Sequence, residues 1–91
     1  MGSGAHGNPE DLKRFAKQLR STSESVSSLG KNLKKTLSGI DWNDSVKTRI
    51  DADVSAAVSG MEKFARKLDE HAKQVDRKAA ELQRYLGSGG H

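Results

Sequence analysis

The sequence predicts an all-α fold, an antiparallel helix-turn-helix hairpin that dimerises into a four-helix bundle. Along two long segments, apolar residues recur at alternating steps of three and four, which is the spacing of one helix face. The single proline stands at position 9, so proline interrupts neither segment. Hydrophobic residues make up 33% of the chain and charged residues 31%, which is typical of long helices with narrow apolar stripes.

Helix one is expected over residues 9–37. Asn8 provides an N-cap side chain, and Pro9 suits the first helical position because its missing N–H would be unpaired there anyway. At the other end, Gly39 can adopt the left-handed conformation that closes a helix. A short turn over residues 38–41 is expected to follow.

Helix two is expected over residues 42–86. Asp41 is the expected N-cap, with Trp42 in the first turn and Asp44 close to the free amides there. Gly87 is a natural C-cap. Because the connection is so short, the two helices should double back on each other as an antiparallel hairpin.

The predicted hairpin spans residues 8–86 and is flanked by two segments of different composition. Residues 1–7 and 87–91 are rich in glycine and serine and lack apolar periodicity. We interpret both as flexible tails introduced during cloning.

The apolar stripes identify the residues expected to hold the hairpin and its partner together. If the turn centres near residues 39–40, Phe15 lies close to Phe64 and helix one ends before helix two does. Residues beyond about 72 would then lack a partner within the hairpin, and their exposed apolar stripe would mark an interface. The expected seam residues are Leu12, Phe15, Leu19, Val26, Leu29, Leu33, Val54, Met61, Phe64, Leu68, Val75, Leu82 and Tyr85.

No pattern in the sequence indicates catalysis, a cofactor or a metal site. Cysteine is absent, no glycine-rich phosphate loop is present, and a two-helix hairpin has no room for a sizeable pocket. His6 and His91 lie in the predicted tails, far in sequence from His71, so no local ligand cluster forms. We interpret His71 as a half-exposed histidine at the bundle edge, with a pH-sensitive contact as the alternative.

The charge pattern leaves two other kinds of binding open. Sixteen basic and twelve acidic residues give a net charge of +4, but the signs alternate along the helices, which is weak support for nucleic-acid binding. Membrane-surface binding, with Trp42 and Phe15 as anchors, is the other alternative, although heptad spacing favours a protein partner. The sequence has neither a membrane-spanning apolar stretch nor the pattern of a signal peptide.

Two long amphipathic helices joined by a tryptophan turn resemble the WXG (Trp-Xaa-Gly) helical hairpins, the ESAT-like small substrates of type VII secretion. The resemblance covers residues 8–86, and the turn here is Trp42-Asn43-Asp44, with aspartate at the position of the family's glycine. It implies a non-enzymatic protein that forms a homodimer or a heterodimer with a related hairpin. It also implies synthesis in the bacterial cytoplasm, contact with a secretion ATPase, and export without a cleavable signal peptide.

Proteins of that family often carry a C-terminal Tyr-x-x-x-Asp/Glu signal. Here Tyr85 is followed by Leu86-Gly87-Ser88-Gly89, which lacks the acidic residue. Three explanations stay open: the native end was removed in cloning, the partner carries the signal, or this chain is not a secreted member.

Overall fold

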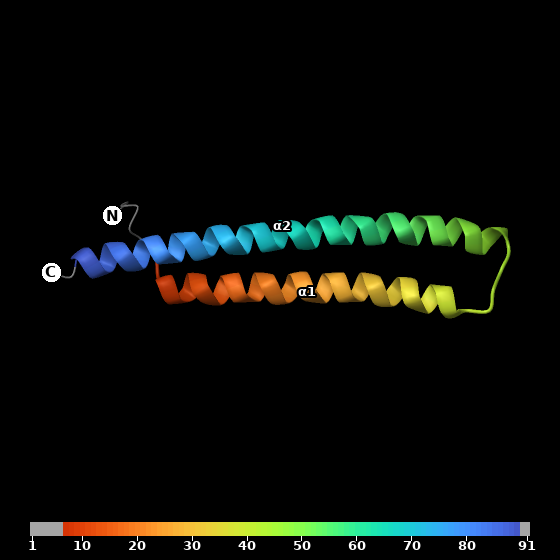
Figure 1. The fold of residues 1–91 in the computed structure, drawn as a ribbon, viewed down its shortest axis with the longest axis horizontal. Coiled ribbons are helices and arrows are strands. Elements are labelled where there is room, and N and C mark those ends of the chain that lie inside the picture. Colours follow the sequence, from red (N-terminus) through yellow and green to blue (C-terminus); the bar gives the residue numbers. More distant parts are fainter. Residues whose placement is uncertain (1–6, 90–91) are drawn as a thin grey trace.

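The computed structural model describes residues 7–89 and shows two long α-helices packed side by side as an antiparallel hairpin (Figure 1). The first helix, α1, spans Pro9–Gly39, and the second, α2, spans Ser45–Gly89. The principal extents of the molecule are 71 × 20 × 15 Å, so it is a narrow rod. The all-α hairpin predicted from the apolar spacing is therefore confirmed.

The ends of α1 follow the predicted capping at one end only. The Asn8 side chain accepts a hydrogen bond of 2.9 Å from the Glu10 N–H, and Pro9 occupies the first turn. At the other end, Gly39 does not take the expected left-handed conformation. The helix instead runs two residues further than expected, and Ile40, in an extended conformation, ends it.

The start of α2 differs from the expected one because Asp44, and not Asp41, caps the helix. The Asp44 carboxylate accepts hydrogen bonds from the backbone N–H groups of Val46 and Lys47, at 2.9 and 3.0 Å. Trp42 consequently lies in the connection between the helices, outside the first turn of α2. The helix also continues past the expected cap at Gly87, to Gly89. The predicted tails, apart from residues 7 and 87–89, lie outside the described residues.

A buried hydrogen bond defines the register of the two helices. The Ser23 hydroxyl donates to the Ala65 carbonyl oxygen at 2.9 Å, which places these residues at the same level. Phe15, eight residues before Ser23, is then level with residue 73, because both helices rise by the same amount per residue. The expected pairing of Phe15 with Phe64 is wrong, because the longer connection displaces α2 along α1.

The same shift shortens the expected overhang of α2. Ala79 and Leu82 are buried, with exposed fractions of 1% and 3%, so the chain beyond residue 72 still packs against α1 and the residues before it. Leu82 lies against Gly7, where an added Cβ would approach its Cδ1 to 3.0 Å. Only the end of α2 projects, and there Tyr85 and Leu86 are exposed.

Small residues, together with Val58, form most of the contact between α1 and α2. They recur every seven residues, so each turns toward the other helix at the same angle. Gly30 allows the closest approach, since a Cβ at this position would lie 3.2 Å from a methyl carbon of Val58. We name this contact the small-residue seam. It consists of Ala16, Ser23 and Gly30 of α1 and Val58, Ala65, Ala72 and Ala79 of α2.

Candidate protein-binding surface

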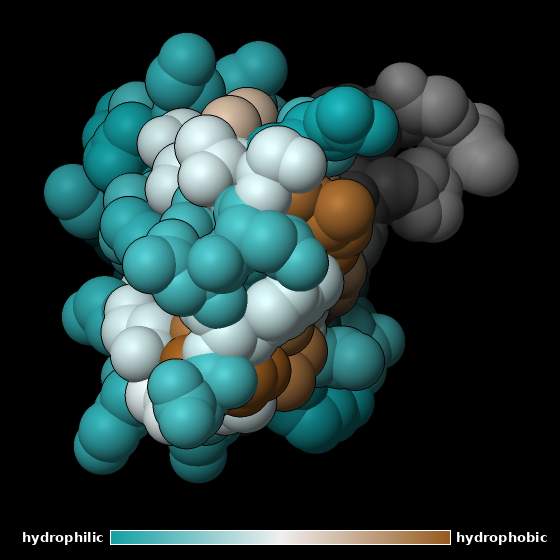
Figure 2. Space-filling view, turned by 90° about the vertical axis from the view of Figure 1, so that its right-hand side faces the viewer, coloured by the Kyte–Doolittle hydropathy of each residue, from teal (hydrophilic) through white to brown (hydrophobic). Residues whose placement is uncertain are grey.

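Large apolar side chains gather on one side of the hairpin. Four of the largest, Phe15, Leu29, Leu33 and Phe64, are between 48% and 62% exposed. Figure 2 shows the apolar residues of both helices on one side of the rod and hydrophilic residues on the other. We name this side the apolar face. Its residues are Leu12, Phe15, Leu19, Val26, Leu29 and Leu33 of α1 and Ile50, Val54, Met61, Phe64, Leu68 and Val75 of α2.

Helix geometry explains why both stripes share a side. On each helix, most of the large apolar residues lie one residue before, or three residues after, a residue of the small-residue seam, as Phe15 and Leu19 do around Ala16. These offsets turn the side chain to one side of the seam. Because the helices are antiparallel, the same turn on both leads to the same side of the pair. The result is one continuous apolar face instead of two separate stripes.

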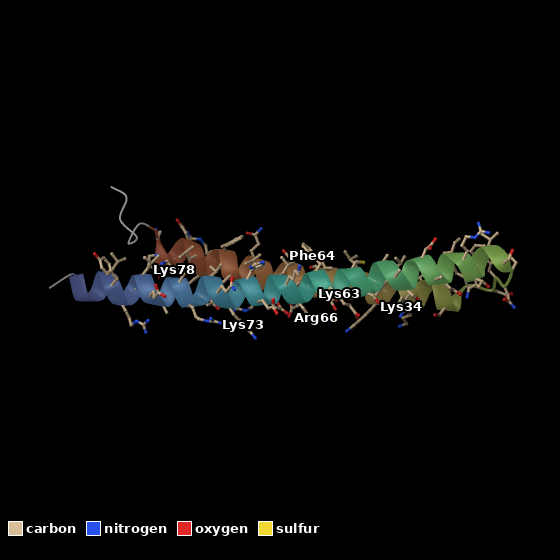
Figure 3. All side chains as sticks on the ribbon, turned by 90° about the horizontal axis from the view of Figure 1, so that it is seen from above. Lys34, Lys63, Phe64, Arg66, Lys73 and Lys78 are labelled. Atoms are coloured by element: carbon tan, nitrogen blue, oxygen red, sulfur yellow. The ribbon has the colours of Figure 1, made fainter. Side chains whose placement is uncertain are left out.

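Uncharged residues border the middle of the apolar face on α1, and charges dominate the opposite side of the rod. Gln18, Ser25 and Asn32 form the α1 border. Figure 3 shows Phe64 on one side of α2, with Arg66 and Lys73 on the other. A shallow open groove on that second side is polar and charged, and it is lined by Ser23, Glu24, Ser27, Lys31, Glu62, Ala65, Arg66 and Asp69. An ion pair between Arg20 and Asp76 also joins the helices outside the apolar face.

The connection between the helices holds Trp42 in place. The backbone N–H of Trp42 donates to the backbone carbonyl oxygen of Ile40 at 3.0 Å. The Trp42 residue is half-buried. Hydrogen bonds from the Lys47 backbone N–H and the Trp42 side chain lower the pKa of the Asp44 carboxyl from its ordinary value of 3.8. Asp44 thus links the start of α2 to the orientation of the tryptophan.

Comparison with protein families gives this arrangement a name. The WXG100 family, described as proteins of 100 residues with WXG, matches residues 6–85. The chain belongs to the WXG100 family. WXG100 proteins are non-enzymatic helical hairpins that serve as substrates of type VII secretion. No curated protein and no solved structure gave a significant match to the chain.

The predicted turn motif of this WXG100 hairpin forms part of the connection and includes the cap of α2. Trp42, Asn43 and Asp44 all lie in the connection, and Asp44, at the position of the motif's glycine, caps α2. A glycine there has no side chain to accept these hydrogen bonds. The departure from Trp-Xaa-Gly therefore replaces a flexible residue with a helix cap.

The predicted seam residues of the WXG100 hairpin divide into three groups. Leu82 is buried between the helices. A second group is half-buried at the edge of the small-residue seam: Leu12, Leu19, Val26, Val54, Met61, Leu68 and Val75. The third group is exposed and takes little part in the contact between α1 and α2: Phe15, Leu29, Leu33, Phe64 and Tyr85.

The residues that hold the two helices together were missed by reasoning from large side chains. The pattern that could have identified them is a second seven-residue repeat, of the small residues Ala16, Ser23 and Gly30, which runs beside the repeat of large apolar residues. His71 is exposed next to the apolar face, with its Nδ1 3.4 Å from the Gln74 side-chain oxygen.

Two further properties of the described residues concern metals and membranes. Between residues 7 and 89, no group of three or more histidine, aspartate or glutamate side chains is placed to hold a metal ion. Neither α1 nor α2, over its described length, is long and apolar enough to cross a membrane.

Proposed function

We propose that this WXG100 hairpin works by pairing, through its apolar face, with a second related hairpin, and that the resulting four-helix bundle is the form exported by type VII secretion. The exposure of Phe15, Leu29, Leu33 and Phe64 carries the proposal. A continuous exposed apolar surface bordered by polar residues is typical of a protein interface. The uncharged α1 border supports the proposal further, since few charges of that helix would lose their hydration when the face is covered.

The thin contact between α1 and α2 supports the same conclusion. Val58 and Leu82 are the only large apolar side chains among the buried residues of the described chain. Burying a large apolar side chain contributes about 1.5–3 kcal/mol, whereas alanine and glycine contribute far less. Pairing would bury the remaining large side chains and supply the stability that the single hairpin lacks.

A charge placed on the apolar face tests the proposal. The Phe64→Asp variant should lose association with a related hairpin and should no longer be exported, because pairing would bury an unpaired carboxylate. Arg66→Asp places the same group on the other side of α2, and it should leave both properties intact. Pairing is measured by light scattering after size-exclusion chromatography, and export by the protein in culture medium. Unchanged pairing and export of Phe64→Asp would refute the proposal.

The secretion ATPase is a second proposed partner, engaged by the end of α2. Tyr85 and Leu86 project beyond the N-terminal end of α1 and are 61% and 50% exposed. Aromatic side chains held on a rigid helix are frequent anchors at interfaces. A Tyr85→Ala variant that pairs normally should be exported less, whereas normal export would exclude Tyr85 as a contact.

A further inference from the structure

We propose that His71 makes the pairing of this hairpin sensitive to pH, so that the paired form is kept in neutral solution and released in mildly acidic solution. The inference rests on the pairing proposed above and adds a condition under which that pairing ends. Three observations carry it: the position of His71 beside Phe64 on α2, the uncharged side chains that face it from α1, and the positive charges on its own helix.

His71 continues the line of residues on α2 that contains Phe64. The two residues are seven positions apart, so their side chains point in nearly the same direction around the helix. Both are exposed in the single hairpin. Leu68 and Val75 of the apolar face lie three residues before and four residues after His71, which makes them its neighbours on the helix surface. A partner that covers the apolar face therefore covers the imidazole as well.

Protonation changes the cost of covering His71. Histidine is the side chain that ordinarily changes its charge between pH 8 and 5. A neutral imidazole needs only hydrogen-bond partners when it is covered, and Nδ1 of His71 already lies 3.4 Å from the side-chain oxygen of Gln74. A protonated imidazole would carry a full charge into an apolar interface, and removal of its water strongly disfavours that charged form.

The side of α1 that faces His71 offers no charge to balance a protonated imidazole. The register of the hairpin places Lys17 level with His71, but Lys17 lies on the polar side, seven residues before Glu24 of the polar groove. Asp11 lies about 9 Å further along the rod and is already paired with Arg14. The α1 residues on the apolar side near this level are uncharged, and they are Phe15, Gln18 and Leu19.

The charged neighbours of His71 on α2 would add to the cost of its protonation. On a helix, the residues three or four positions away are the ones that can touch a side chain, and among these only Lys67 is charged. Lys78, one heptad after His71, is also basic and pairs with Glu81 at 3.4 Å. The nearest acidic residues in sequence lie on other sides of α2, and they are Asp69, Glu70 and Asp76.

Pairing should therefore weaken as the pH falls. The free hairpin, with His71 in water, binds a proton more readily than the paired hairpin does, so added protons shift the equilibrium toward the free form. One proton bound at each released His71 raises the dissociation constant by up to about tenfold for each pH unit. Carboxyl groups stay largely ionised above about pH 5.5, so a response between about pH 7.5 and this value belongs to histidine.

Sedimentation equilibrium at about pH 7.5 and about pH 5.5 tests the inference, with the full chain alone and mixed with a co-expressed WXG100 hairpin. The wild-type complex should dissociate at the lower pH. His71→Gln keeps a polar side chain that does not titrate, so its complex should be equally stable at both values. His71→Lys carries a positive charge throughout, and it should pair weakly at both values.

The other two histidines of the chain provide a matched control. They stand at positions 6 and 91, in the segments that flank the hairpin. A variant with both replaced by glutamine keeps His71, so it should lose its partner in acid as the wild-type chain does. If this double variant pairs equally at both pH values, the response belongs to the flanking histidines and the inference is wrong.

Three results would overturn the inference and leave the proposed function standing. Equal pairing of the wild-type chain at both pH values would show that His71 is not covered. Dissociation in acid that persists in His71→Gln would assign the response to other groups. Tighter pairing in acid, lost in His71→Gln, would show that a carboxylate of the partner faces the imidazole. A wild-type chain that forms no complex at either pH would contradict the proposed function together with the inference.

Discussion

The Ser23 hydroxyl donates a hydrogen bond of 2.9 Å to the carbonyl oxygen of Ala65, and both residues are buried between α1 and α2. No other side-chain hydrogen bond within residues 7–89 joins the two helices in a buried position. Alanine and glycine neighbours would tolerate a slide of one helix along the other, because their surfaces are nearly alike. The Ser23 hydroxyl is bonded at one level of α2, so this hydrogen bond favours the observed register.

Replacing Ser23 with alanine should lower the free energy of unfolding by about 1 kcal/mol, the usual net value of one hydrogen bond. Ser21→Ala, on the exposed surface of the same helix, is the control and should change stability little. Urea denaturation followed by circular dichroism measures both. Equal stability of the two variants would show that the bond to Ala65 contributes nothing.

Gly30→Leu should lower the free energy of unfolding by about 1–3 kcal/mol, as overpacking of a tight contact does. The reason is the 3.2 Å that would separate a new Cβ from the Val58 methyl carbon. Gly39→Leu is the matched control, because nothing lies within 4 Å of a Cβ there. If Gly30→Leu unfolds at the same urea concentration as Gly39→Leu, the helices are further apart than described.

Leu82→Ala should destabilise the hairpin by about 2 kcal/mol or more, since it empties a buried site. Leu82 is 3% exposed, whereas Leu86, four residues later, is 50% exposed. Leu86→Ala should therefore have a much smaller effect on the thermal midpoint. An equal fall in the thermal midpoint of the two variants would indicate that Leu82 is not packed in the hairpin and that α2 projects further beyond α1, as expected from the sequence.

The stability of the turn should fall in acid because the pKa of Asp44 is lowered on folding. A carboxyl whose folded pKa lies below its unfolded value stabilises the fold above the unfolded pKa, and that contribution is lost as the pH falls through the folded value. Trp42 fluorescence should therefore change below about pH 3.8, the ordinary value. Asp44→Asn keeps an acceptor for the cap but cannot titrate, so this change should disappear. Its persistence in the variant would assign the titration to another group.

The sequence was sufficient to predict both helices and their antiparallel arrangement, because large apolar residues at heptad spacing leave few alternatives. It was insufficient for the register. Asp41 and Asp44 are equally good caps as residue types, and only the packed structure selects Asp44. Because α2 starts after Asp44 instead of after Asp41, the connection is longer and the residues of α1 pack against different residues of α2 than expected.

The sequence also did not show which side of each helix packs against the other helix of the hairpin. Two seven-residue repeats lie side by side on each helix, one of small residues and one of large, as with Ala16 beside Phe15. Size alone suggested that the large residues pack against each other within the chain. The close approach at Gly30 is possible only where side chains are small, so the large ones are left on the outside.

The small-residue seam has a consequence for the life of the chain in a cell. A single copy buries mostly small side chains between its helices and leaves large apolar side chains such as Phe15 and Phe64 exposed to solvent. Chaperones and proteases recognise such surfaces, because most folded proteins conceal them. We therefore expect the lifetime of each newly synthesised chain in the cell to depend on how soon it pairs with a second hairpin.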